Sequence, residues 1–462
     1  MKSFYLELKS LCKSFKFLAF ILVLISYQAM LANQFDSQSV NEQIYQLRSN
    51  ERYLSENRSM VEYWEKRERL VLEEGPEAVR FSWTRIQADL AWYRYETKLA
   101  EKISQAYLEG DWATYNHYLA KKGMLEWNIV EIFDEDESSP YCPYISPQEY
   151  FGSRWQKAQS LLEPEVQGLP YWFSERRAAI PRPEQLIFAT DLHLRLYEAD
   201  LPPLSPHGTS PWQFVFNYMR QGLPKILGLV VLLMTVNILH REKKSGAIKV
   251  SLQNPKARVH YIVRKVFLGF VSSLLVVAIP QIVMFLGLGF GKGYRGLNMP
   301  VLIDKGFLNW SIDPEHLRLL RWTDYFGSVG LSQYVPSYNG YTAVERMEFI
   351  PLWQFLLLAL VALALFVLLC SVLGVLISIL VKNEIFAQMT AVGVFALGSS
   401  LGRIFPKLKT TPWDIFSKAN VIPILEGNHN SSYSYSLVAM AIVALLLMAL
   451  AARLFRKQDI TS

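Results

Sequence analysis

Six stretches of predominantly apolar residues constrain the fold of this chain more than any other feature. A helix needs about 20 such residues to cross a bilayer, and each stretch reaches or approaches that length. They cover residues 15–32, 222–240, 266–289, 351–381, 385–404 and 437–454. Hydrophobic residues make up 51% of the chain and charged residues 19%. The sequence therefore predicts an α-helical polytopic membrane protein with six transmembrane helices.

The basic residues predict how these helices are oriented. The short segment 240–265, between the second and third stretches, carries eight Lys and Arg residues and a single acid, Glu242. Basic residues in short loops resist translocation, so such a loop marks the cytoplasmic side. Lysines near the N-terminus, Lys382, and the basic residues near the C-terminus fall on that same side of a six-span arrangement. We expect both termini in the cytoplasm, and we attribute the net charge of +6 to topology and not to nucleic-acid binding.

Residues 1–32 are predicted to form an amphipathic N-terminal helix followed by the first span. A cleaved signal peptide is the competing interpretation, because a basic start and an apolar stretch fit both. Met30 and Ala32 make a poor small-x-small cleavage site, which favours an uncleaved span.

Residues 33–211 form a large, mainly helical extracytoplasmic insertion between the first two spans. Helical periodicity runs through 41–74 and 85–122, with Gly75-Pro76 as a break and Gly110-Asp111 as a loop or a helix boundary. The many Trp and Tyr residues indicate either an aromatic core or a platform for a ligand, and the first is the simpler interpretation.

The rest of the chain divides at the spans. Residues 212–289 contain the second and third spans with the cytoplasmic loop, and 290–350 form a second extracytoplasmic segment that we expect to pack on the first. Residues 351–462 contain the last three spans, a segment at 405–433 whose pattern suits short half-inserted helices, and a cytoplasmic tail.

Motifs for an independent chemistry are missing from the sequence. It has no GxxxxGK[ST] phosphate loop and no HExxH, and the last three spans carry no acid in their interior. The 3 cysteines are too far apart for a disulfide or a metal site. We therefore expect no catalytic residue, metal or cofactor in this chain, so energy for transport must come from another chain.

The segment after the second span resembles the cytoplasmic loop of ABC-2 type transporter permeases. In that family an acid, a glycine and a Pro-x-x-Arg follow the second span, and Glu242, Gly246 and Pro255-Lys-Ala-Arg258 match this order, with Lys265 entering the third span. Ala247 stands where the family often has Thr. The amphipathic start, the insertion after the first span and the ending 455–460 are also similar to the family. The long segment 290–350 departs from its shortest members and leaves the substrate open.

This resemblance implies a permease subunit of an ATP-binding cassette exporter, in the plasma (inner) membrane of a bacterium. The implied partners are an ATPase subunit that binds ATP and Mg, a second permease copy and the lipid bilayer. The coupling residues would be Glu242, Gly246, Ile248, Leu252, Pro255 and Arg258, with a short helix over 246–254 whose Ile248 and Leu252 enter a groove of the ATPase. A basic loop held by anionic lipid headgroups is the alternative.

Small and polar residues on the second and fifth spans are candidates for the substrate path or the dimer interface. They are Thr235, Asn237, Gln388, Thr390, Gly393, Gly398, Ser399, Ser400 and Gly402. Plain helix–helix packing accounts for such residues equally well. The alternative for the whole protein is a membrane-anchored sensor or assembly protein, whose extracytoplasmic domain binds a ligand or partner.

Overall fold

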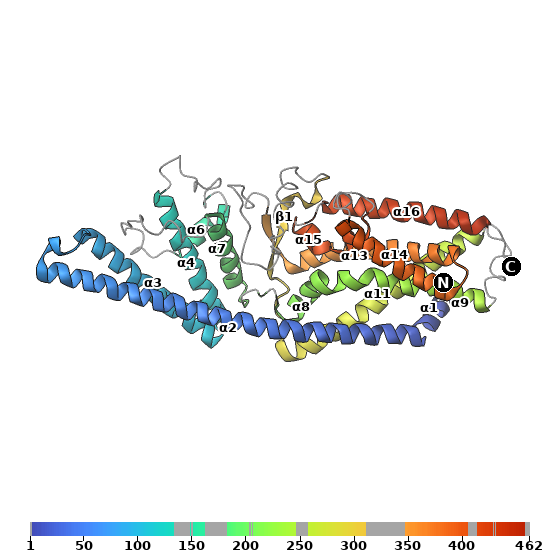
Figure 1. Ribbon diagram of the computed structural model, residues 1–462, viewed down its shortest axis with the longest axis horizontal. Helices are drawn as coiled ribbons and strands as arrows, with labels where there is room; N and C mark the ends of the chain where they lie inside the picture. Colours follow the sequence, from blue (N-terminus) through green and yellow to red (C-terminus); the bar gives the residue numbers. More distant parts are fainter. Residues whose placement is uncertain are drawn as a thin grey trace.

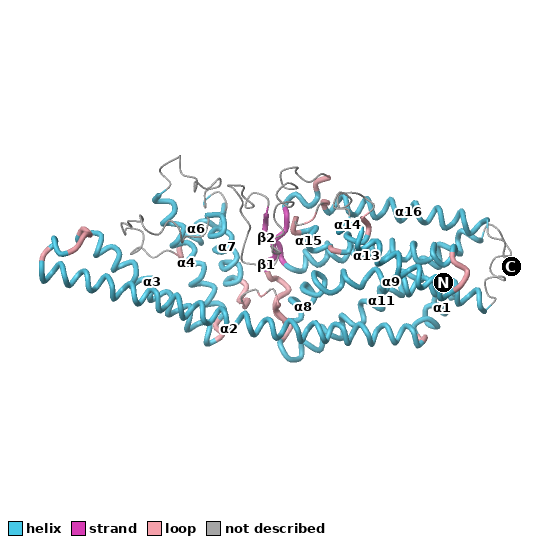
Figure 2. Tube along the Cα trace, viewed as in Figure 1, coloured by secondary structure: helices cyan, strands magenta, loops and turns pink. Residues whose placement is uncertain are grey.

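The computed structural model describes residues 2–133, 148, 151–161, 183–202, 205, 207–245, 257–310, 347–404, 414–427, 429 and 431–457. It is an elongated molecule built almost entirely of helices, with a bundle of apolar helices at one end and a polar helical domain at the other (Figures 1 and 2). The polar domain contains α3, α4, α6 and α7, and one long helix, α2, runs through both halves.

The main elements follow the chain in this order. They are α1 (Lys2–Cys12), α2 (Phe15–Glu74), α3 (Trp83–Glu109), α4 (Trp112–Phe133), α6 (Trp155–Gln159), α7 (Pro183–Glu198), α8 (Pro211–Asn217), the π-helical η3 (Tyr218–Gly222), α9 (Leu223–Ser245), α11 (Ala257–Lys292), β1 (Pro300–Asp304), β2 (Met347–Pro351), α13 (Leu352–Leu380), α14 (Glu384–Ile404), η6 (Phe416–Ala419), α15 (Val421–Leu425) and α16 (Tyr433–Lys457). Short 3-10 turns occur at η1 (Pro76–Ala78), η2 (Gly152–Arg154) and η4 (Lys305–Leu308).

The first span and the first external helix are a single helix, where the sequence predicted two. Helix α2 has 60 residues, which corresponds to about 90 Å at 1.5 Å per residue. Ser14 caps its start by accepting a hydrogen bond from the Phe17 amide at 3.3 Å. It ends at Gly75, which has a φ of 93°. Residues with a side chain rarely adopt this backbone conformation. The two-helix prediction was wrong because nothing between 33 and 40 stops a helix, although several residues there are weak helix formers.

The start of α2 belongs to the apolar bundle. Phe17 and Leu24 are buried in one cluster with Val230, Met234 and Val276. The start of α2 therefore packs on the second and third spans, and the uncleaved first span stays a prediction.

Helices α3 and α4 pack on the outer half of α2 through an aromatic core. Trp64, Trp92, Tyr93 and Tyr115 are buried in it, as the simpler interpretation of the aromatic residues predicted. The turn between the helices lies at Gly110, which has a φ of 69°, so the predicted boundary is confirmed.

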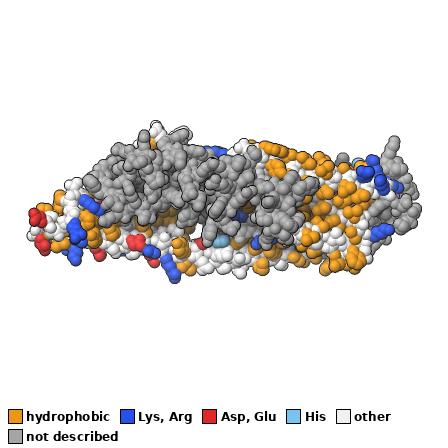
Figure 3. Space-filling view, turned by 45° about the horizontal axis from the view of Figure 1, so that its top comes forward, with side chains coloured by type: hydrophobic (Ala, Val, Ile, Leu, Met, Phe, Trp, Pro, Cys, Tyr) orange, Lys and Arg blue, Asp and Glu red, His pale blue; other side chains and the backbone are white. Residues whose placement is uncertain are grey.

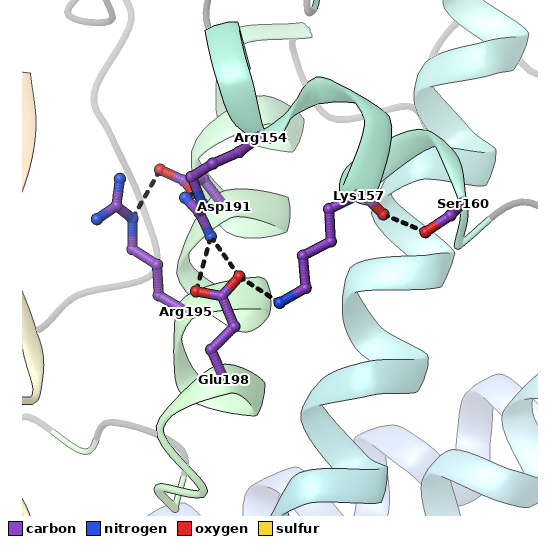
Figure 4. A network of polar contacts seen from close by, with 6 residues as sticks. All are labelled: Arg154, Lys157, Ser160, Asp191, Arg195 and Glu198. Atoms are coloured by element: carbon purple, nitrogen blue, oxygen red, sulfur yellow. Dashed lines mark hydrogen bonds and ion pairs between the residues drawn. The ribbon is translucent and has the colours of Figure 1, made fainter.

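Polar contacts join two helices of the polar domain, α6 and α7 (Figure 4). The buried carboxylate of Asp191 on α7 accepts hydrogen bonds from Arg154 and from Arg195, the latter at 3.0 Å. Glu198 binds Lys157 at 2.8 Å. Since Arg154 and Lys157 lie on or beside α6, these contacts join α6 to α7.

Five helices in the described residues are long and apolar enough to cross a membrane. They lie at Phe15–Glu74, Pro211–Glu242, Arg258–Lys292, Leu352–Leu380 and Tyr433–Lys457. The predicted fifth span is the helix α14, but it is not one of the five, so the six-span arrangement stays a prediction. Hydrophobic side chains cover the surface of this half, and Lys and Arg side chains gather at its end (Figure 3).

Two short strands lie between the halves (Figure 2). β1 and β2 pair antiparallel, with Asp304 opposite Met347 and Pro300 opposite Pro351. The Arg195 guanidinium of α7 lies 5.3 Å from the centre of the Phe349 ring, a cation–π distance. The described part of 290–350 therefore packs on the first insertion, as expected.

Candidate coupling site

The segment that resembles the coupling loop is bounded by two long helices. Helix α9 continues to Ser245, and α11 begins at Ala257, so both extend farther than the predicted spans. The loop between them is shorter than 240–265, because helical hydrogen bonding continues through the charged residues at each end. Gly246, Ile248, Leu252 and Pro255 lie outside the described residues, whereas Glu242 and Arg258 lie within them.

Glu242 takes part in an ionic cluster, whereas Arg258 lies outside it. Its centre is Lys265 on α11, which is 1% exposed. The Lys265 ammonium donates to Glu242 of α9 and, at 2.6 Å, to Glu7 of α1. Tyr261 also donates to Glu242, and Arg264 donates to Glu7. We call these five residues the ionic cluster; they join the N-terminal helix to the ends of the second and third spans.

Helix α16 covers the neighbouring face of α11. The Phe455 ring stacks on Tyr261 at 5.8 Å and 10° between planes. The Arg258 guanidinium donates to the backbone carbonyl of Arg456 at 2.9 Å. The end of α16, which begins the segment 455–460 that resembles the family, therefore contacts α11.

The cluster fixes these helices relative to one another. A buried ammonium is costly unless acids and hydrogen bonds surround it, and two carboxylates and the Tyr261 ring, 5.0 Å away, meet this need. If α1, α9 or α11 moved separately, Lys265 would lose a partner. A force applied to the loop should therefore move all three helices together.

Sequence reasoning found Glu242 and Lys265 but missed Glu7. One signal was present: Glu7 is the first acid in the chain, and the next is Asp36. The lysines of the N-terminal helix are nearer in the sequence than the basic loop, so this signal did not point to the loop. The partner's identity depends on how α1 lies on α11, which the sequence does not specify.

The structure separates the candidate path residues into two groups. Thr235 is fully buried where α9 meets α11 and α13, and its hydroxyl donates to the Val231 carbonyl at 2.8 Å. Gly269 and Gly374 face it from the two neighbouring helices. Thr235 therefore takes part in close helix packing, the alternative that the sequence left open.

The second group lies on α14 and its contact with α9. The Gln388 amide donates to the Asn237 side chain at 2.7 Å, which joins the two helices. Thr390 and Ser399 are exposed, and Gly393 and Ser400 are half-buried. A Cβ at Gly398 would clash with the Phe416 ring. The glycine therefore leaves the space that this ring occupies. The side-chain surroundings of Gly402 lie outside the description.

Short helices η6 and α15 precede the last span. The buried Lys418 ammonium donates to Ser431 at 2.7 Å, and Ser431 contacts Ser436 at 3.0 Å. These contacts attach η6 to the start of α16. Short helices at this position agree with the pattern read from 405–433, although 405–413 lie outside the described residues.

Within the described residues, no group of three or more His, Cys, Asp or Glu side chains could hold a metal ion. The arrangement offers helix contacts and ion pairs that can transmit movement.

Comparison with known protein families identifies the family of this chain. The chain matches the family model described as ABC-2 family transporter protein over residues 1–412, and it belongs to that family. It is thus a transporter membrane subunit of the permease type. Neither the curated proteins nor the solved structures include a match.

Proposed function

We propose that this chain is the permease of an exporter driven by a separate ATPase subunit, which binds ATP and Mg and docks on the loop between α9 and α11. The family membership supports the permease role. The ionic cluster is the observation that carries the coupling part, because it joins the base of this loop to α1 and to two helices of the bundle.

The docking surface in this proposal is apolar. Ile248 and Leu252 would enter a groove of the ATPase, with Lys249 and Lys256 around them. Burying such side chains is worth roughly 1.5–3 kcal/mol each. The Ile248→Asp/Leu252→Asp variant should therefore bind the ATPase at least about a hundredfold more weakly. The measurement is recovery of the ATPase with the affinity-purified permease.

The matched control is Lys249→Ala/Lys256→Ala. It changes the same loop and leaves the apolar pair intact, so it should retain most of the ATPase. If the charge variant lost the partner and the aspartate variant kept it, the loop would be a lipid or electrostatic contact and the proposed docking would be wrong. Membrane insertion of every variant is checked by its yield in the membrane fraction.

The substrate path in this proposal lies between two copies of the chain and includes α14. Its Thr390 and Ser399 are exposed beside Phe386, Met389 and Leu397. The Thr390 hydroxyl already donates to the Phe386 carbonyl at 2.8 Å, so it is tolerated against lipid tails. The small exposed side chains of α14 support close contact with a helix of a second copy, and cross-linking through Ser399→Cys would test it.

A further inference from the structure

The middle of α2 is exposed over a long interval. Phe35 is buried in the core of the membrane part, where its ring lies 6.2 Å from Phe214. Asn50 is the next buried residue along the helix. Between these two positions α2 contributes no buried side chain, so its helical form there depends on its own hydrogen bonds and on surface contacts.

This interval is also rich in weak helix formers. Residues 36–41 read Asp-Ser-Gln-Ser-Val-Asn, and Asp, Ser, Val and Asn each disfavour a helix relative to Ala. The Ser37 hydroxyl donates to the carbonyls of Asn33 and Gln34, both at 3.2 Å, and such back-bonding often bends helices. A helix of this length and composition is marginal on its own.

Polar side chains from other parts of the chain hold the interval at two places. Lys292, the last residue of α11, donates to Asp36 at 2.6 Å, and Thr209 donates to the same carboxylate at 3.0 Å. Six residues farther along, Glu42 accepts a hydrogen bond from Ser205. These contacts connect the exposed part of α2 to the end of the third span and to the segment before α8.

Both sides of the interval are firmly built. Beyond it, α2 and α3 share the buried aromatic core around Trp64 and Trp92, so they form a stiff pair. The polar domain also touches the membrane part through α7, whose Leu192 and Leu196 are buried in the same cluster as Phe35. Rocking of the domain about that contact requires α2 to bend, and the exposed interval offers the least resistance.

We propose that residues 36–45 of α2 form a latched hinge, with Asp36 and Glu42 held by Lys292, Thr209 and Ser205 as the latch. When the latch is closed the helix is straight and the polar domain keeps the position seen here. When it opens, the helix bends and the domain rocks. A kink of about 20° at residue 40 displaces a point about 30 Å farther along the helix by about 10 Å.

The test measures that displacement in the full-length chain. Spin labels are placed at Lys98→Cys on α3 and Leu445→Cys on α16, both exposed, with the native cysteines replaced. Pulsed electron paramagnetic resonance in lipid nanodiscs gives the distance distribution. Lys292→Ala removes an exposed ion pair worth up to about a factor of five in an equilibrium, so the bent population should rise about fivefold.

Two further variants make the result decisive. Lys305→Ala changes another exposed lysine and should leave the distribution as in the parent chain. Ser37→Ala/Asn41→Ala strengthens the helix at two exposed positions and, combined with Lys292→Ala, should restore the narrow distribution. An unchanged distribution in Lys292→Ala would overturn the latch, and broadening that the alanines do not reverse would place the motion elsewhere. The measurement needs no ATPase and stands apart from the docking experiment.

Discussion

At the scale of single residues, buried polar groups define the contacts between elements. Lys265 is the clearest case, since one ammonium serves carboxylates from α1 and α9. His193 is a buried polar group of the polar domain, and it joins α7 to α4. Its Nδ1–H donates to the Asn116 side chain at 2.9 Å, and the Asn116 amide donates to the Leu201 carbonyl at 2.9 Å. Each of these buried groups is satisfied by a partner on another helix.

Lys265→Met should weaken the junction at the base of the bundle. The change keeps the apolar stem and removes the charge that Glu7 and Glu242 share. Hydrogen bonds to charged groups are worth about 2 kcal/mol, so the free energy of unfolding should fall by about that amount in detergent. The control is Lys13→Met, at an exposed position on the same face of the membrane part. Equal thermal stability of the two variants would show that the ionic cluster adds nothing.

His193 should make the polar domain sensitive to acid. Burial, with a smaller effect of Lys122, lowers the pKa of His193 to about 4, whereas the unfolded side chain has a pKa of about 6.5. Below pH 6.5 the unfolded state therefore binds a proton that the folded state does not. This part of the stability is complete above pH 6.5 and is lost as the pH falls toward 4, by up to about 1.4 kcal/mol per pH unit.

His193→Asn keeps a donor for Asn116 and removes the titration. Urea unfolding of the full chain, followed by tryptophan fluorescence at pH 7.5 and pH 5, compares the two proteins. The wild type should lose more stability between these pH values than the variant. The same loss in both would assign the acid sensitivity to carboxylates and not to His193.

At the scale of elements, the helices of the bundle approach most closely where glycine faces Thr235. A Cβ on Gly374 would lie 2.9 Å from the Thr235 Cβ, which is too short for an undisturbed contact. The short distance between α9 and α13 at this crossing therefore depends on Gly374 having no side chain. On α14, by contrast, a Cβ on Gly393 would meet nothing within 4 Å.

Gly374→Ala should destabilise the bundle by about 1–3 kcal/mol, as overpacking does. Thr235→Ala in the same chain should return part of this loss, because it removes the hydroxyl nearest the new methyl group. Gly393→Ala is the matched control and should be neutral or slightly stabilising. Thermal unfolding in detergent measures all three. A Gly393→Ala chain that is stable but inactive in transport would support α14 as a path or interface element.

Sequence reasoning was accurate where a pattern is local. Five of the six apolar stretches coincide with helices long and apolar enough to cross a membrane, and Gly75 and Gly110 marked real helix ends. The joining of span and external helix in α2 was missed because the weak helix formers between 33 and 40 do not by themselves stop a helix. The partner of Glu242 was missed because it depends on tertiary contacts. Thr235 shows why candidate sites are harder, since a small polar residue in a span suits a path as well as packing, and only neighbouring helices decide between them.

At the scale of the whole molecule, the long axis of α2 relates the two halves. The Lys and Arg residues gather at the end of the bundle (Figure 3), and the polar domain lies at the other end (Figure 1). Which end faces the cytoplasm stays a prediction from the basic residues.

That orientation can be tested by labelling single cysteines in intact cells. Lys98 is exposed on α3, so Lys98→Cys should react with an impermeant maleimide added outside. Val250→Cys, in the loop between α9 and α11, should react only after the cells are permeabilised. If Val250→Cys reacted in intact cells, the predicted orientation would be wrong. The proposed ATPase site would then not face the cytoplasm.

The pairing of β1 with β2 has a consequence for how the protein can be modified. Five residue pairs, from Pro300 with Pro351 to Asp304 with Met347, bring the two ends of the intervening segment together before α13 begins. Closing a longer loop costs little more than closing a short one. An epitope tag or small binding module inserted between 311 and 346 should therefore leave the bundle's thermal stability unchanged. Such an insertion would allow affinity capture of the intact protein.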